Sequence, residues 1–204
     1  MLVYVIGFAS QLFFSARVLV QWIMSEKAKR VLSPSLFWIF SLAGSYLMCI
    51  YGWMRHDFAI ILGQVISYYV YLWNLYLKGV WRVLPAAVRW ALFLTPVVAA
   101  GFVLSDAEAV MSRLFETDGL PVWMVVYGSL GQIIFTFRFI YQGIYSLRKK
   151  ESVLPTGFWV ISLVGSLTIV SYAVMRLDPV LILGQSFGMI SYIRNLFIGR
   201  GKRG

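Results

Sequence analysis

The sequence predicts an all-α membrane protein in which seven transmembrane helices form two parallel three-helix repeats joined by one linker helix. Composition, apolar runs and an internal repeat lead to this prediction. Of the 204 residues, 60% are apolar or aromatic and 13% are charged, and the mean hydropathy is +0.79. Soluble domains have about 45–50% apolar and about 25% charged residues. The composition therefore excludes a soluble enzyme domain and a disordered chain.

Seven apolar runs are long enough to cross a bilayer. The hydrocarbon core is about 30 Å thick, so one helical span needs about 20 residues. We expect the helices, in order along the chain, at residues 2–24, 35–54, 58–77, 86–104, 121–146, 156–175 and 179–198.

The loop charges predict the orientation of these helices. Thirteen Lys and Arg residues and two acidic residues fall on one side, whereas three Arg and six acidic residues fall on the other. Loops rich in Lys and Arg stay in the cytoplasm. We therefore expect the N-terminus outside and the C-terminus in the cytoplasm. The net charge of +10 then reflects contact with anionic lipids and not with nucleic acid.

An internal repeat covers most of the chain. Residues 7–79 align with 128–200 at a constant offset of 121, and 26 of the 73 positions are identical. Each repeat holds three expected helices, and a single linker helix lets both repeats run in the same direction. We divide the chain into a first repeat at 1–80, a linker helix with an acidic external loop at 81–120, and a second repeat at 121–204.

Polar side chains recur on one face of each repeated helix. Their spacing of three or four residues puts them on the same face, and lipid cannot satisfy their hydrogen bonds, so these faces should turn inward. Ser and Gly at such positions can also serve close packing alone, and Gln or Asn can serve as interhelical contacts. The first repeat has Gln11, Arg17, Gln21, Trp38, Ser41, Gln64, Tyr71 and Asn74, and the second has Gln132, Arg138, Gln142, Trp159, Ser162, Gln185, Tyr192 and Asn195.

Arg17 and Arg138 are the sharpest of these candidates. Each lies about 10 Å inside the cytoplasmic end of its expected helix, at 1.5 Å per residue. An arginine at that depth is costly, and its guanidinium group can bind phosphate oxygens in a fork. A side chain that snorkels to the interface is the structural alternative. Trp38 and Asn74 should lie at a similar depth, where Trp can contact a sugar or belong to the interfacial belt.

Four charged residues lie at the outer ends of the expected helices. They can form an ion-pair gate between the repeats, or they can be ordinary loop charges, since exposed pairs contribute little. These residues are Arg55, Asp57, Arg176 and Asp178.

Several kinds of site are missing from the sequence. No acidic residue lies inside an expected span, so ion-coupled transport is disfavoured. Walker motifs, Gly-rich nucleotide loops and metal-spaced His/Cys clusters do not occur either. We therefore expect no metal, no cofactor and no enzyme activity.

The repeated pattern resembles a known family. It reads Gln…Phe-x-x-Arg-x-x-x-Gln, then Phe-Trp-x-x-Ser-Leu-x-Gly-Ser, then Gly-Gln…Tyr-x-x-Asn-Leu. This pattern is similar to the N-terminal-like domain of lipid-A-disaccharide synthase, a membrane family of the PQ-loop superfamily, to which the SWEET sugar transporters belong. The resemblance implies a 3 + 1 + 3 bundle like that of a transporter, and a lipid-linked sugar as substrate.

From these observations we expect a flippase in a bacterial inner membrane. It would move a polyprenyl-phosphate-linked sugar of the undecaprenyl type to the outer leaflet, for modification of lipid A or lipopolysaccharide. Arginines and their neighbours would bind phosphate, Trp and Asn would contact the sugar, and Gln and Ser would line the passage. The expected partners are this lipid, membrane lipids and a membrane glycosyltransferase. The alternatives are a SWEET-like uniporter of a small soluble sugar or metabolite and a non-transporting partner that positions a glycosyltransferase. The phosphate and substrate residues are Arg17, Arg138, Gln21, Gln142, Trp38, Trp159, Asn74, Asn195, Tyr71 and Tyr192, and the passage residues are Gln11, Gln132, Gln64, Gln185, Ser41 and Ser162.

Overall fold

A computed structural model describes residues 2–105 and 121–200, and the regular secondary structure in those two ranges is entirely helical. The chain therefore has the predicted all-α class. The helices are α1 (Leu2–Ala28), α2 (Ser35–Met54), α3 (Phe58–Leu77), α4 (Val80–Val83), α5 (Ala86–Ser105), α7 (Val122–Lys149), α8 (Thr156–Met175) and α9 (Pro179–Arg200).

Six of the described helices, α1, α2, α3, α7, α8 and α9, are long and apolar enough to cross a membrane. They occupy six of the seven predicted ranges, so the chain is a multi-pass membrane protein. Helix α5 occupies the remaining range. Its apolar segment, Ala86–Ala99, is shorter than the other six candidate spans. The seventh span and the 3 + 1 + 3 arrangement stay predictions. The expected acidic outer loop, at 106–120, lies outside the described residues.

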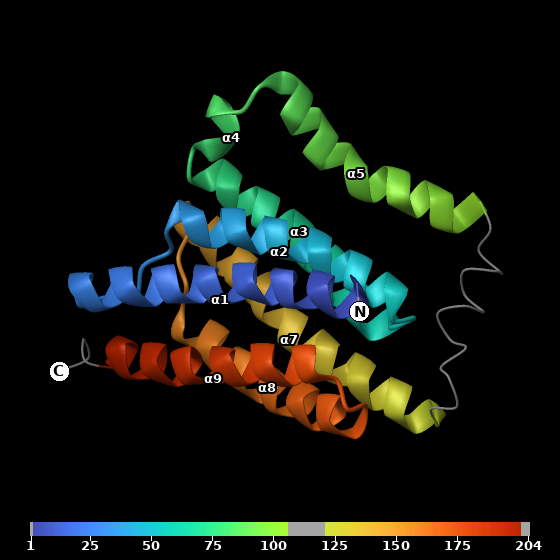
Figure 1. Ribbon diagram of the computed structural model, residues 1–204. Coiled ribbons are helices and arrows are strands. Elements are labelled where there is room, and N and C mark those ends of the chain that lie inside the picture. Colours follow the sequence, from blue (N-terminus) through green and yellow to red (C-terminus); the bar gives the residue numbers. More distant parts are fainter. Residues whose placement is uncertain (1, 106–120, 201–204) are drawn as a thin grey trace.

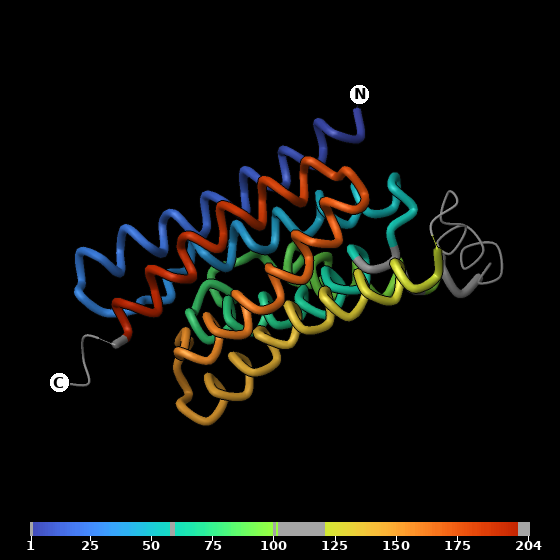
Figure 2. The backbone as a smooth tube through the Cα atoms, turned by 90° about the horizontal axis from the view of Figure 1, so that it is seen from below, coloured from blue at the N-terminus to red at the C-terminus, as the bar shows by residue number. Residues whose placement is uncertain are grey.

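The two repeats meet through two equivalent helix pairs. Within the repeats, α2 packs against α1 and α3, and α8 packs against α7 and α9; between them, α1 contacts α9 and α3 contacts α7. The offset of 121 converts one of these inter-repeat contacts into the other. Figures 1 and 2 show α1 and α9 side by side and running in the same direction, with α5 on one side of the bundle.

The bundle buries many polar side chains beside its apolar core and exposes large apolar side chains on its outside. Leu12 is 72% exposed and Leu183 is 60% exposed, whereas Gln21, Asn74 and Gln142 are completely buried. A soluble protein has the opposite distribution, because its charged and amide side chains stay in water. The outer surface is therefore suited to lipid, and the inside holds the groups that lipid could not satisfy.

The same short signals begin the helices of both repeats. Pro34 and Pro155 come directly before α2 and α8, where a missing N–H costs nothing. Asp57 and Asp178 precede α3 and α9, and their carboxylates accept hydrogen bonds from backbone N–H groups in the first turn. The repeat in sequence therefore gives two copies of one local structure.

Candidate anion-binding pocket between the repeats

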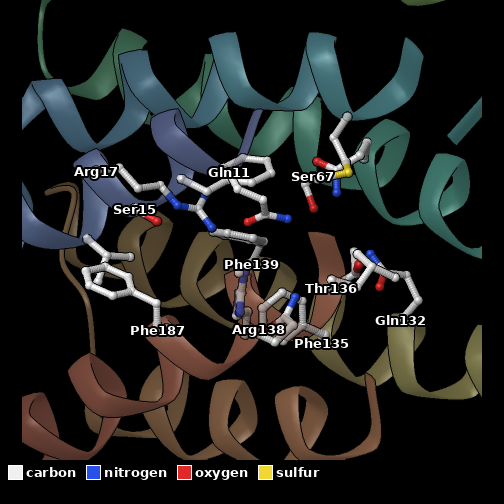
Figure 3. Close-up of a pocket in the computed structure, with 18 of the residues that line it drawn as sticks. Gln11, Ser15, Arg17, Ser67, Gln132, Phe135, Thr136, Arg138, Phe139 and Phe187 are labelled. Carbon is white, nitrogen blue, oxygen red and sulfur yellow. The ribbon is translucent and has the colours of Figure 1, made fainter. Parts of the chain in front are cut away.

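A pocket lies where α1, α3, α7 and α9 face one another, and Figure 3 shows side chains from both repeats directed into it. The space open to the centres of water molecules is about 40 Å³, and one water needs roughly 10–15 Å³ by this measure. The pocket thus has room for a small polar group. Eight of the predicted site residues line it: Gln11, Arg17, Gln64, Tyr71, Gln132, Arg138, Gln185 and Tyr192.

Arg17 reaches the pocket from α1 and is 5% exposed. One terminal nitrogen, Nη1, donates to Ser41 Oγ at 2.9 Å and lies 3.5 Å from Tyr71 Oη. Its guanidinium carbon lies 4.5 Å from the ring centre of Phe14 and 5.8 Å from that of Phe139. These contacts hold the cation by hydrogen bonds and by cation–π attraction.

Arg138 reaches the same pocket from α7 and is 2% exposed. Its Nη1 lies 3.5 Å from Tyr192 Oη, the equivalent of the Arg17–Tyr71 contact. Its guanidinium carbon lies 4.5 Å from the ring centre of Phe139. Phe139 therefore contacts both cations, and the two positive charges share one small space.

No acidic residue balances these charges within the described part of the chain. The ion pairs found there all involve other arginines, and the pocket lining contains neither Asp nor Glu. The Nε atoms of Arg17 and Arg138 are buried without a hydrogen-bond partner. Arginine stays protonated in proteins, and an unpaired buried charge is costly. An anion in the pocket would lower that cost.

Buried amide pairs join the repeats at the end of the bundle that carries the basic loops. Gln21 and Asn195 exchange hydrogen bonds of 2.8 and 3.1 Å, and Gln142 and Asn74 exchange bonds of 3.0 and 2.9 Å. These four predicted substrate residues do not line the pocket. Instead, they close the bundle beside it.

The two predicted tryptophans also lie outside the pocket lining. Trp38 Nε1 donates to Ser33 Oγ at 2.9 Å and to Ser152 Oγ at 3.1 Å. Trp159 Nε1 is buried without a hydrogen-bond partner. At the offset of 121, Leu154 replaces Ser33 and Val31 replaces Ser152. The two repeats therefore differ in chemistry at this pair of tryptophans.

The four predicted outer residues come together across the repeats. Arg176 pairs with Asp57, and Arg55 Nη2 lies 3.8 Å from Asp178 Oδ2. Burial lowers the pKa of Arg176, but the Asp57 carboxylate and Tyr172 raise it, and the net direction is upward. Tyr172 Oη also donates to Asp57, at 3.1 Å. Both ends of the bundle are thus closed by polar contacts between repeats.

The two predicted serines, Ser41 and Ser162, do not line the pocket. Ser41 contacts Arg17, as described, and its hydroxyl also donates to the Phe37 carbonyl. Ser162 donates to the equivalent carbonyl of Phe158. Both serines are completely buried.

Several residues of the site were not among the predicted ones. The spacing of Ser67 from Gln64 and Tyr71 predicts that it shares their polar face on α3, but it was not among the predicted passage residues, and the second repeat has Gly188 at that position. Phe139 corresponds to Val18 in the first repeat. A search for repeated residues therefore could not find it. Ser15 and Thr136 also line the pocket and were missed in the same way, because the two repeats differ there.

The sequence was compared with models of protein families and with solved structures. The family model described as the Lipid A Biosynthesis N-terminal domain matches the chain twice, at residues 6–76 and 127–197. The two matches confirm the predicted tandem copies. No solved structure matches, so the expected PQ-loop membership has no structural support.

The relatives share a common name. The chain is 32% identical over 203 residues to a lipid-A-disaccharide synthase of Chlamydia pneumoniae and 30% identical over 207 residues to one of Chlamydia abortus. The alignments cover 96% and 97% of this chain but 33% of each relative. The chain therefore spans about a third of the length of these relatives.

These names correct the functional prediction. They denote an enzyme, so the predictions of a flippase, of a SWEET-like uniporter and of a protein without an enzymatic role are wrong. The error has a physical origin, because two parallel repeats around a polar interior can hold a headgroup without moving it. The fold alone does not determine whether a protein binds a headgroup or transports it.

Proposed function

The chain belongs to the Lipid A Biosynthesis N-terminal domain family, and from this premise we propose that it is the membrane-embedded, substrate-binding part of a lipid-A-disaccharide synthase. The pocket binds the phosphate of a glycolipid. Glycosyl transfer takes place in the catalytic part of such a synthase. The relatives' name and the family description support the lipid A context.

The observation that carries this proposal is the pair of buried arginines without an acidic partner in the described pocket. A phosphate group balances both charges and accepts hydrogen bonds from the free Nε atoms of Arg17 and Arg138. Such charge-assisted bonds are roughly twice as strong as neutral ones. Gln64 Oε1, which is also buried without a partner, can accept a hydrogen bond from a sugar hydroxyl.

Two kinds of lipid carry this chemistry. One is an acylated sugar phosphate, and the other is a polyprenyl-phosphate-linked sugar. Both present a phosphate ester next to a sugar, and both keep their hydrocarbon in the membrane. The pocket recognises the phosphate that both lipids share and a sugar hydroxyl next to it, and a binding experiment with both lipids distinguishes the sources.

We further propose that the N-terminus lies outside and the C-terminus in the cytoplasm of a bacterial inner membrane. The basic loops then meet anionic lipid on the cytoplasmic side. In this orientation the amide pairs formed by Gln21 and Gln142 close the cytoplasmic end, and the arginine pocket lies directly beyond them. The same proposal keeps the division at 1–80, 81–120 and 121–204.

The test is lipid binding by the purified protein in nanodiscs. An acylated sugar phosphate, its dephosphorylated analogue and a polyprenyl-phosphate-linked sugar are titrated separately. We expect at least one phosphate-bearing lipid to bind about tenfold or more tightly than the dephosphorylated analogue, since one charge-assisted hydrogen bond contributes about 1.5–3 kcal/mol. Equal binding of the phosphorylated and dephosphorylated lipids by folded protein would overturn the proposal.

Substitution of each pocket arginine tests whether these two side chains bind the phosphate. Arg17→Gln and Arg138→Gln should each weaken binding of the phosphate-bearing lipid about 10- to 100-fold. Arg194→Gln is the matched control, because it removes the same charge from an exposed pair with Glu26 outside the pocket. Since the pocket arginines lack an ion partner, their removal should leave the thermal stability of lipid-free protein unchanged or higher. Arginines that serve only as structural anchors would lower stability and leave lipid affinity unchanged.

A further inference from the structure

The pocket is bordered by two helix seams that the repeat relates to each other. We call the contact between α1 and α9 the first seam and the contact between α3 and α7 the second seam. If the repeats were identical in sequence, both seams would be equally open or closed. Their side chains differ, and so does their exposure.

The second seam is filled. Thr136 is 2% exposed, Phe139 is 1% exposed and Ser67 is 3% exposed. Every residue that α7 contributes to the pocket lining is buried. On the α3 side Gln64 is half-buried, so the approach to the arginines between α3 and α7 is narrow and is covered by α7.

The first seam is more open. Gln11, Phe14 and Ser15, which line the pocket from α1, are only half-buried. Phe187 on α9 is 38% exposed, and among the described residues that line the pocket it is the one with an exposed side chain. Figure 3 shows Ser15 and Phe187 on the same side of the pocket. These residues connect the pocket to the outer surface.

The difference in exposure follows from side-chain size. At the offset of 121, Ser15 corresponds to Thr136 and Val18 to Phe139. At these two positions α7 therefore carries an additional methyl group and an aromatic ring compared with α1. On α9 the first seam has Phe187 in place of Ile66 and Gly188 in place of Ser67. The smaller side chains of α1 leave the first seam less completely filled beside Phe187.

We propose that the first seam is the binding site for the hydrocarbon chain of the glycolipid whose phosphate lies at Arg17 and Arg138. This inference rests on the proposed function. The pocket, at about 40 Å³, is too small for a lipid chain, so the chain must leave it. Polar contacts between the repeats close both ends of the bundle. The chain therefore leaves sideways, and the less filled seam is the exit.

The surface outside the first seam suits hydrocarbon. Leu183 and Ile190, each 60% exposed, lie one turn before and one turn after Phe187 on α9. Leu12 on α1 is 72% exposed. The lipid chain follows these residues while the phosphate stays on the arginines. The seam borders a pocket whose two arginines have buried, unpartnered Nε atoms, and this distinguishes it from an ordinary lipid-facing groove.

Photo-crosslinking tests the proposal on a chain that is otherwise unchanged. A benzophenone amino acid replaces Phe187 in one sample and its counterpart Ile66 in the other. The probe is an acylated sugar phosphate with radiolabel in its hydrocarbon chain. We expect at least tenfold more labelled adduct at position 187. Excess unlabelled phosphate-bearing lipid should remove this adduct, whereas the dephosphorylated analogue should not.

A variant in which a larger side chain fills the first seam provides the second test. Val18→Phe introduces the residue that closes the second seam and should weaken lipid binding at least tenfold. Ile66→Phe is the matched control, because it adds a ring on the other seam without lining the pocket. If the protein binds lipid but crosslinking at position 66 equals or exceeds that at position 187, the first seam is not the binding site of the hydrocarbon chain. The proposed function would still stand. Failure of unmodified protein to bind phosphate-bearing lipid would overturn both.

Discussion

At the scale of single residues, two tryptophans at the same position of the repeat have different hydrogen bonding. Trp38 Nε1 donates to two serine hydroxyls, and Trp159 Nε1 has no partner. Trp→Phe removes one ring and one N–H from either site, so the loss of size is common to both. Trp38→Phe should therefore lower the free energy of unfolding by about 1–3 kcal/mol more than Trp159→Phe.

Reversible unfolding in mixed micelles measures this difference. The two variants serve as each other's control, since both rings are almost completely buried. Equal losses of stability would show that the hydrogen bonds from Trp38 Nε1 to Ser33 and Ser152 contribute nothing to the stability of the folded state.

The same comparison shows what the repeat can reveal about residues. Arg17 and Arg138 could be found from sequence, because a costly residue appears twice at the same depth. Ser33, Ser152 and Phe139 could not, because each has an apolar counterpart of different size or polarity in the other repeat. The asymmetry that these residues create depends on which side chains meet across the repeats, and sequence alone does not specify those contacts.

At the scale of helices, the inter-repeat contacts depend on two amide pairs. Gln142 and Asn74 join α7 to α3, as Gln21 and Asn195 join α1 to α9. A double-mutant cycle of Gln142→Ala and Asn74→Ala should give a coupling energy of about 0.5–2 kcal/mol in unfolding measurements. The pair Gln142 and Asn195 makes no such hydrogen bond and should give a coupling near zero. A coupling near zero for Gln142 and Asn74 as well would contradict the amide contact.

The helix ranges were predictable because bilayer thickness fixes the length of an apolar span. Helix α4 was not predicted, since Val80–Val83 is too short to show a hydrophobic period. The sequence placed Arg17, Trp38 and Asn74 at a similar depth but did not show that Asn74 pairs with a residue of the other repeat. Depth follows from position along a helix, whereas the partner depends on how the helices pack.

At the scale of the whole molecule, the bundle is closed at both ends and has its charged pocket in between. Amide pairs close one end, and the pairs of Arg55 with Asp178 and Arg176 with Asp57 close the other. The polar interior between the repeats explains why the sequence alone suggested transport. A polar interior between repeats is required for binding a headgroup in lipid, and transport needs in addition that the ends open.

The orientation of the molecule decides which leaflet supplies the glycolipid. Lys149 is the last residue of α7, at the end that we propose to be cytoplasmic. Leu177, which is 81% exposed, lies between α8 and α9 at the opposite end. In a Cys49→Ala background, which removes the single native cysteine, Leu177→Cys should react with a membrane-impermeant maleimide added from outside. Lys149→Cys should react only after the membrane is opened, because loops rich in Lys and Arg stay in the cytoplasm.

The parallel arrangement of the repeats, which we predict, supplies an internal control for this experiment. Arg30→Cys should behave like Lys149→Cys, and His56→Cys like Leu177→Cys, since each pair lies at equivalent ends of the two repeats. Labelling of Lys149→Cys and Arg30→Cys from outside would reverse the proposed orientation. The amide pairs would then face outward, and a glycolipid made in the cytoplasm would meet the end with the ion pairs first. If only one member of each pair reacted from outside, the equivalent ends of the two repeats would lie on opposite sides of the membrane. That result would contradict the parallel arrangement.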